Sequence, residues 1–372
     1  MKSRLIPSII DFDPQLWAAL AGATSPMMEW GWLSALEIGG VTQSGGSWQP
    51  HTLELVDSDD EVAMVCPLYL REESDGEYFW YEPLERAELL RGRVPGPRAV
   101  IAVPWTPVPG RRILTGSTGG EEREALLAEA AGACLRLASE RGWRSVHLLF
   151  CTAEEEAAFA RAGFFGRRSY QFQWENPKPQ SGGSFDEYLR GLSSSRRNSV
   201  RRERRTLAEL GIEVRHESGS ASTFTNFWED YRATARRNDC EEPPLPESFM
   251  SALESQFAHR VEFAVARKGR EVLGRSLNLL GLDGCYYGRY WGAADPPQFL
   301  HFEVALYAGI ERCLELGLAR FDPGFGGEHK LSRGFAPQPV YSAHWYADPG
   351  LQTQGAFFAQ REAQWLENNV GW

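Results

Sequence analysis

Residues 321–335, FDPGFGGEHKLSRGF, place four different ionisable side chains within six positions of a glycine-rich segment. These side chains are Glu328, His329, Lys330 and Arg333. A packed strand would not carry them side by side, because each costs free energy to bury unless it is paired or bound to a ligand. The segment therefore indicates a site. The alternative is an ordinary polar loop, since glycine-rich loops are commonly surface connections.

Lys330 departs from the chain's own use of cations. The sequence has 39 Lys plus Arg residues, of which only Lys2, Lys178, Lys268 and Lys330 are lysines. An ammonium differs from a guanidinium in being a compact, mobile point charge with a tunable pKa. A lysine in this position suits chemistry better than it suits a solvated surface.

A second set of charged residues forms the basic cluster SSSRRNSVRRERR, in which Glu203 is the single acid among six arginines between Arg196 and Arg205. Helical spacing of about 100° per residue separates a basic stripe from an apolar face. The stripe is Arg197, Arg201, Arg204 and Arg205, and the apolar face is Leu192, Val200, Leu207 and Leu210. Such a stripe matches phosphate oxygens, so its partner could be a nucleic acid, a diphosphate or an acidic protein surface. A solvated helix face is the alternative.

A third set is aromatic and surrounds one arginine, in YYGRYWG at residues 286–292. Strict strand alternation would put Tyr287, Arg289 and Trp291 on one side of the sheet. The next predicted helix begins near His301 and Glu303, which are either site residues or a cap and a first-turn acid that the helix dipole favours. Packing is the ordinary role for most of the aromatic rings.

Composition excludes several classes of protein. The 372 residues carry a net charge of −11, which argues against nucleic-acid binding over the whole surface. Six scattered cysteines and seven histidines form no metal-ligand spacing, so no metal site is predicted. The motifs GxSxG, GxxxxGK[ST] and GxGxxG are absent. No run approaches the roughly 20 apolar residues of a membrane span, and no signal peptide is evident, so we expect a cytoplasmic protein without an integral membrane segment.

The expected elements divide the chain near the stretch NPKPQSGGS, residues 176–184. We predict an N-terminal domain at 1–178 and a C-terminal domain at 179–372. The first has a hairpin around residues 57–60 and a helix that stops at Gly142; the second has helices over 185–210 and 223–237, three strands over 261–292 and a helix closed by Gly317. The fold class is α/β (α+β).

Together with LHFE, YGRYWG, VPWTPVPGRRIL and QFQWEN, these motifs make nearly the whole chain resemble the FemAB-like (peptidoglycan biosynthesis/recognition) family of the GNAT N-acyltransferase superfamily. The resemblance implies two tandem GNAT-like domains, each a mixed, mostly antiparallel sheet flanked by helices. It also implies transfer of an amino acid from aminoacyl-tRNA to an amine. Asp322, Gly326, Gly327 and Lys330 match a glycine-rich turn and lysine of its members.

One N-terminal motif departs from the family pattern. Where members carry KxHSxGEYVFD, this chain reads REESDGEYFWY, with Arg71, Glu73 and Tyr81 in place of a Lys, a His and an Asp. The acceptor is therefore left open between a small molecule, a peptide and a peptidoglycan precursor.

The predicted function is Fem-like aminoacyl transfer with aminoacyl-tRNA as co-substrate and no cofactor. Lys330 would stabilise an oxyanion or a phosphate, and His329 or Glu328 would relay the proton. The predicted substrate-binding residues are Arg333, Arg289, Tyr287, Trp291, His301, Glu303, Asp322 and Phe335. Arg197, Arg201, Arg204 and Arg205 would contact tRNA. The alternatives are an acetyl-CoA or acyl-CoA N-acyltransferase, although GAADPPQFL lacks the usual pyrophosphate loop, and a non-catalytic binder of RNA or cell-wall precursor.

Overall fold

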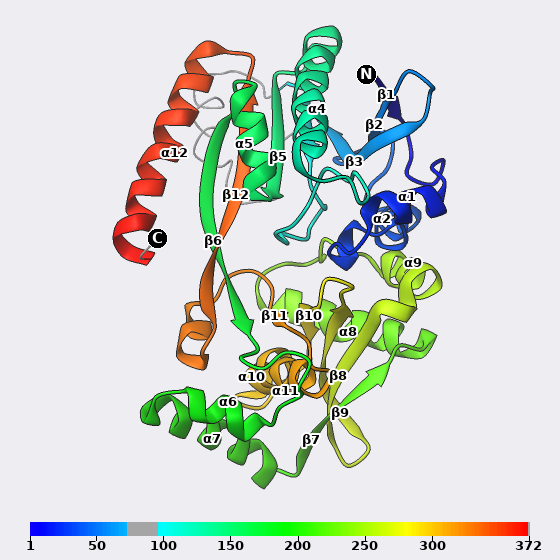
Figure 1. The fold of residues 1–372 in the computed structure, drawn as a ribbon. Coiled ribbons are helices and arrows are strands. Elements are labelled where there is room, and N and C mark those ends of the chain that lie inside the picture. Colours follow the sequence, from blue (N-terminus) through cyan, green and yellow to red (C-terminus); the bar gives the residue numbers. More distant parts are fainter. Residues whose placement is uncertain (73–95, 371–372) are drawn as a thin grey trace. The chain divides into compact units, whose positions relative to one another are not determined.

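The computed structural model describes residues 1–72 and 96–370, which form two compact units (Figure 1). The first unit comprises Met1–Tyr170 and Pro339–Trp372, and the second comprises Gln171–Gln338. The chain passes between the units within two strands, β6 (Phe165–Glu175) and β12 (Ala336–Tyr346). These units differ from the predicted domains 1–178 and 179–372 chiefly in that the C-terminal segment belongs with the first unit.

The sheet of the first unit has the strand order β1-β2-β3-β4-β5-β12. Besides β12, its strands are β1 (Lys2–Ile6), β2 (Gln49–Val56), β3 (Val62–Arg71), β4 (Arg98–Ile101) and β5 (Ser145–Cys151). Neighbours are antiparallel except for β4 and β5, which are parallel. The predicted hairpin is confirmed as β2 and β3.

The helices of the first unit cover an apolar core. They are α1 (Pro14–Ala21), η1 (Pro26–Met28), α2 (Trp30–Ile38), α4 (Gly120–Arg141), α5 (Ala153–Arg161) and α12 (Pro349–Val370). The predicted helix with its stop at Gly142 is confirmed as α4, whose buried Leu127 and Cys134 pack with Leu53 and Leu148 of the sheet. The apolar residues at helical spacing therefore form the buried face of this helix, as the pattern predicted.

The sheet of the second unit repeats the pairing pattern of the first. Its order is β6-β11-β10-β9-β8-β7, and its other strands are β7 (Ile212–Ser218), β8 (Val261–Lys268), β9 (Glu271–Leu280), β10 (Cys285–Gly292) and β11 (Arg320–Asp322). Among the described pairs of this second sheet, only β10 and β11 are parallel. The mixed, mostly antiparallel sheet flanked by helices is confirmed, and the arrangement as two tandem GNAT-like domains stays a prediction.

Helical segments of the second unit are α6 (Phe185–Gly191), α7 (Ser194–Glu209), α8 (Ala221–Arg237), α9 (Glu247–Phe257), η2 (Ala258–Arg260), α10 (Leu300–Phe302), η3 (Glu303–Tyr307), α11 (Ala308–Glu315) and η4 (Glu328–Arg333). The segment predicted as helix over 185–210 breaks between α6 and α7, where the Ser193 side chain caps the second helix. In the predicted helix after residue 300, η3 is a π-helical turn, a feature that is frequent at functional sites.

One local prediction was wrong. Leu210 is 43% exposed and does not share the buried face of Leu192, Val200 and Leu207, because α7 has already ended at Glu209. Glu328 and His329 begin the 3₁₀ helix η4. Within the described part of the chain, no helix is both long and apolar enough to cross a bilayer.

Candidate active site

A cavity of about 200 Å³ lies in the second unit, at the end of β10 and beside the glycine-rich turn after β11. Its lining residues are Ser276, Asn278, Gly288, Arg289, Tyr290, Trp291, His301, Ala305, Leu306, Pro323, Gly324, Phe325, Gly326, Gly327, His329 and Lys330. Five residues predicted for the site therefore meet at one cavity: Arg289, Trp291, His301, His329 and Lys330.

The turn that shapes this cavity depends on glycine. Gly324 has a φ of 82°, and a Cβ there would lie 3.1 Å from the carbonyl oxygen of Gly288. Gly327 has a φ of 86°, and a Cβ there would lie 2.5 Å from the His329 ring. Residues with a side chain rarely adopt this backbone region, so the glycines allow the chain to turn tightly into η4.

Lys330 points back into this turn and is only 4% exposed. Its Nζ donates hydrogen bonds to the carbonyl oxygens of Gly324, at 2.7 Å, and of Phe325, at 3.3 Å. Burial lowers the pKa of the Lys330 ammonium to about 8, although the charge of Asp322 opposes that shift. An ammonium has three donors, so these two bonds leave one N–H of Lys330, which lines the cavity, unused.

Arg289 enters the cavity from a β-bulge. The register of β10 on β9 shifts between Gly288 and Tyr290, which leaves Arg289 as the extra residue. The alternation predicted for residues 286–291 is therefore wrong beyond Gly288, because a bulge resets which side chains share a face. Residues 288–291 all line the cavity.

A buried carboxylate holds Arg289 in place. Arg289 Nη1 donates to Asp322 Oδ1 at 3.0 Å, and the same oxygen accepts from the backbone N of Gly324 at 2.9 Å. The side chains of Arg289 and Asp322 are 4% and 1% exposed. Asp322 thus ties the arginine to the glycine-rich turn without lining the cavity.

The two histidines of the cavity are neutral near pH 7. Burial lowers the pKa of His301 to about 4, helped by the positive charges of its neighbours, and burial also lowers the pKa of His329. His301 packs on Trp291, with ring centroids 4.7 Å apart, and on His329 at 5.9 Å. His329 Nε2 is buried without a hydrogen-bond partner among the described residues. In the tautomer that carries its proton on Nδ1, this nitrogen is a proton acceptor.

Arg333 is a structural hub rather than a cavity residue. Its Nη2 donates to both carboxylate oxygens of Glu203 at 2.9 Å, its Nε donates to Tyr307 Oη at 2.7 Å, and its Nη1 donates to the His329 carbonyl. The guanidinium also lies 3.6 Å from the Phe302 ring centroid. With its donors occupied in this way, Arg333 fixes η4 against α7 and the π-helical turn.

Glu203 and Tyr307 are residues that the sequence reasoning missed. Tyr307 donates a hydrogen bond to Glu203, which is buried together with Arg333. The signal was present, because Glu203 falls at helical spacing with Val200 and Leu207, on the face that packs inward. A single acid on the buried face of an arginine-rich helix indicates a buried cation opposite.

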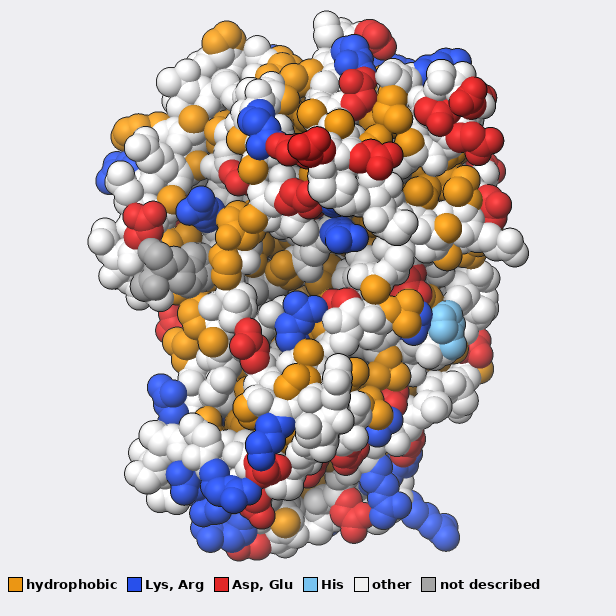
Figure 2. Space-filling view, in the orientation of Figure 1, with side chains coloured by type: hydrophobic (Ala, Val, Ile, Leu, Met, Phe, Trp, Pro, Cys, Tyr) orange, Lys and Arg blue, Asp and Glu red, His pale blue; other side chains and the backbone are white. Residues whose placement is uncertain are grey.

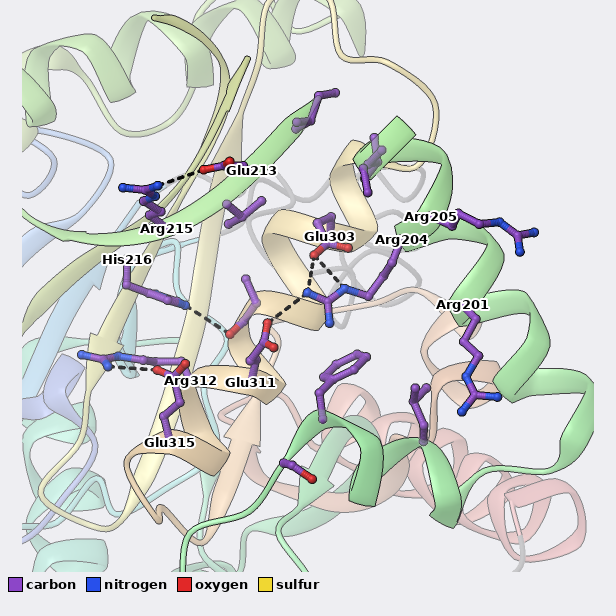
Figure 3. A pocket seen from close by; sticks show the side chains of 18 of the residues that line it. Arg201, Arg204, Arg205, Glu213, Arg215, His216, Glu303, Glu311, Arg312 and Glu315 are labelled. Atoms are coloured by element: carbon purple, nitrogen blue, oxygen red, sulfur yellow. Dashed lines mark hydrogen bonds and ion pairs between the residues drawn. The ribbon is translucent and has the colours of Figure 1, made fainter. Parts of the chain in front are cut away.

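The basic cluster borders a separate groove of about 1120 Å³ in the second unit (Figure 3). Arg204 lies inside it and bonds to Glu303 at 2.9 Å and Glu311 at 3.0 Å. In Figure 3, Arg201 and Arg205 extend from α7 away from these acids. Arg205 has one exposed acid, Glu209, at 3.8 Å. The exposed guanidinium groups of Arg201 and Arg205 can therefore meet an external anion, whereas Arg204 is held closely by two carboxylates.

Arg197 also departs from the predicted stripe. It donates to the carbonyl oxygens of Leu189 and Leu192, both at 3.0 Å, and so satisfies the end of α6. Exposed arginines of α7 are Arg196, Arg201, Arg202 and Arg205. Figure 2 shows Lys and Arg side chains gathered over the region of α6 and α7.

Several predicted site residues thus lie outside the cavity. Glu303 lines the groove of Figure 3, and Glu328 is exposed on η4. Tyr287 and Phe335 are buried, the first bonded to Asp283 and the second packed on Phe321. These positions favour His329 over Glu328 as the proton acceptor.

The altered N-terminal motif is described only in part. Arg71 is buried in the first unit, with its guanidinium 4.2 Å from the Trp48 ring centroid. Glu73 and Tyr81 lie outside the described residues.

Comparisons with known proteins identify a family from the sequence and, separately, a similar fold among solved structures. A model of the FemAB-like family, described as peptidoglycan biosynthesis/recognition, matches residues 8–371. The crystal structure of FemX is similar with a TM-score of 0.59 at 10% identity, covering 95% of this chain and 99% of that chain. The structure of L-PGS from Bacillus licheniformis is similar with a TM-score of 0.53 at 12% identity, covering 94% of this chain and 96% of that chain. At such identities the structural similarity concerns the fold alone. No curated protein matches the chain.

Proposed function

The chain belongs to the FemAB-like family, and from this premise we propose that it is an aminoacyltransferase. It joins an amino acid carried by aminoacyl-tRNA to the amine of an acceptor through an amide bond. The observation that carries the proposal is Lys330, a buried ammonium with a donor to spare in a small cavity that also holds the neutral His329. Aminoacyl-tRNA is a cytoplasmic molecule, so the proposal places the protein there.

The chemistry requires little more than orientation, a proton acceptor and charge stabilisation. The acceptor amine attacks the ester carbonyl, and Lys330 donates a hydrogen bond to the oxyanion that forms. His329 Nε2 takes the proton released by the amine. The C–N bond is then complete, the ester C–O bond breaks, and the proton passes to the departing ribose oxygen. The ester is already activated, so positioning supplies much of the acceleration.

The exposed arginines of α7 are proposed to contact the tRNA backbone. Arg201 and Arg205 line the groove and are exposed, and the ion pair of Arg205 with Glu209 is long, at 3.8 Å, and solvent-exposed. Because Arg204 is held by two carboxylates, Arg201 and Arg205 are the phosphate contacts. Exchanging Arg201 and Arg205 for Gln is expected to weaken tRNA binding equally for all sequences. The slope of log affinity against log salt should fall in magnitude by about 1.4–1.8.

The matched control removes the same charge from the first unit. Arg136→Gln with Arg161→Gln takes away two exposed arginines, which are 50% and 56% exposed. This pair should leave the salt slope unchanged in filter-binding or fluorescence titrations. Equal loss in both double variants would assign the effect to overall charge and remove Arg201 and Arg205 from the tRNA site.

The function itself is tested by supplying both donor classes to the purified protein. A pool of tRNAs charged with isotope-labelled amino acids, or acetyl-CoA, is incubated with a panel of amines, and products are identified by mass spectrometry. We expect products heavier by one labelled aminoacyl residue, lost when the tRNA is deacylated beforehand. Acetylated products from acetyl-CoA with none from tRNA would establish the acyl-CoA alternative instead.

A further inference from the structure

We infer that the cavity binds a carboxylate at Arg289, and that the acceptor is therefore an amino acid or a peptide with a free carboxylate. That the bound carboxylate belongs to the acceptor rests on the proposed function, whereas the carboxylate subsite itself rests on the geometry of Arg289. It narrows the acceptor from any amine to an amine joined to an acid.

The first observation is an unused edge of a buried guanidinium. Arg289 Nη1 donates hydrogen bonds to Asp322 Oδ1 and to the carbonyl oxygen of Gly288. Its Nε and Nη2 have no hydrogen-bond partner among the described residues, although the side chain is only 4% exposed. Leaving two buried donors unsatisfied costs free energy, and together these two atoms form the fork that binds both oxygens of a carboxylate.

The second observation is the charge of the cavity wall. Arg289 and Lys330 are its two cations, and none of the described residues that line it is an Asp or a Glu. Burial keeps the pKa values of His301 and His329 low, so neither ring adds charge near pH 7. Asp322 behind the wall offsets one cation, and an anion balances the remaining charge.

The third observation is size. At about 200 Å³ the cavity falls below the roughly 300–1,000 Å³ of pockets that enclose drug-sized ligands. Arg289 and Lys330 line the same small space, so a carboxylate on the arginine lies close to the reacting carbonyl. A free α-amino acid satisfies both requirements, because one carbon joins its amine to its carboxylate; in a dipeptide the reacting N-terminal amine is one residue farther from the carboxylate.

The test compares acids with their amides by isothermal titration calorimetry. The probes are L-alanine and L-alanyl-L-alanine against L-alaninamide and L-alanyl-L-alaninamide, with wild type and Arg289→Lys. Wild type should bind each acid about 10- to 100-fold more tightly than its amide. The Arg289→Lys variant keeps a charge beside Asp322 but loses the fork, so it should lose most of that preference.

Two outcomes overturn the inference. One is equal binding of acid and amide to wild type, a comparison that needs no variant to fold. The other is a preference that follows the donor: if transfer from tRNAs charged with Asp or Glu exceeds transfer from Asn or Gln, and acid and amide acceptors react equally, the carboxylate belongs to the donor. Because calorimetry requires no turnover, a lost transfer activity with a retained acid preference would reject the proposed function and leave the subsite standing.

Discussion

Replacing Lys330 by methionine is expected to lower kcat/KM for aminoacyl transfer by about 10²- to 10³-fold, the usual cost of removing one oxyanion donor. Methionine fills the space but cannot donate to an oxyanion. The side chain is 4% exposed and bonded to Gly324 and Phe325, so circular dichroism and thermal unfolding should accompany steady-state kinetics. Wild-type kinetics in a variant that folds normally would remove Lys330 from the chemistry.

Lys330→Arg supplies the matched control for charge and pH. Since burial lowers the pKa of Lys330 to about 8, the wild-type side chain is an ammonium below pH 8 and a neutral amine above it. The ammonium fraction falls about tenfold between pH 7 and pH 9. Arginine stays charged throughout, so the ratio of wild-type to variant kcat should fall by the same factor. A ratio that stays flat with pH would mean that the charged form is not required.

Truncating Arg333 to alanine is expected to lower the free energy of unfolding by about 3–5 kcal/mol, because it leaves the buried Glu203 without its cation. Arg333 and Glu203 are each 6% exposed, and Arg333 Nη2 lies 2.9 Å from Glu203 Oε1. Denaturant unfolding followed by circular dichroism measures the change. Lost packing of the guanidinium on Phe302 adds to it.

The double variant Glu203→Ala with Arg333→Ala separates the pair from its surroundings. The double variant should lower the free energy of unfolding by less than the sum of the two single variants, since neither charge is then buried without its partner. Arg161→Ala is the exposed comparison, because it breaks a pair with Glu124 in which the side chains are 56% and 57% exposed. Such pairs contribute about 0–1 kcal/mol. Similar losses of unfolding free energy for Arg161→Ala and Arg333→Ala would contradict the stabilising role assigned to the buried Arg333.

Local patterns predicted a large part of the fold and of the cavity. The hairpin of β2 and β3, the helix α4 and the strands β8, β9 and β10 follow from alternation, helical spacing and glycine stops, all of which act within one element. The cavity lysine also followed from its neighbours in sequence. The bulge at Arg289 and the π turn at Glu303 did not, because each inserts or shifts a residue in response to packing from other elements.

By itself, the sequence predicted Lys330, His329 and Arg289 as candidate site residues, and all three line one cavity among glycines and aromatic rings. Tertiary structure decided which charged side chains are paired with other residues and which keep unbonded groups. Glu203 and Arg333 are 130 positions apart and neutralise each other. Arg204 is paired with Glu303 of η3 and Glu311 of α11, while two buried nitrogens of Arg289 have no hydrogen-bond partner among the described residues. The reason is physical: periodicity fixes the face on which a side chain lies, but its partner depends on which distant element packs against that face.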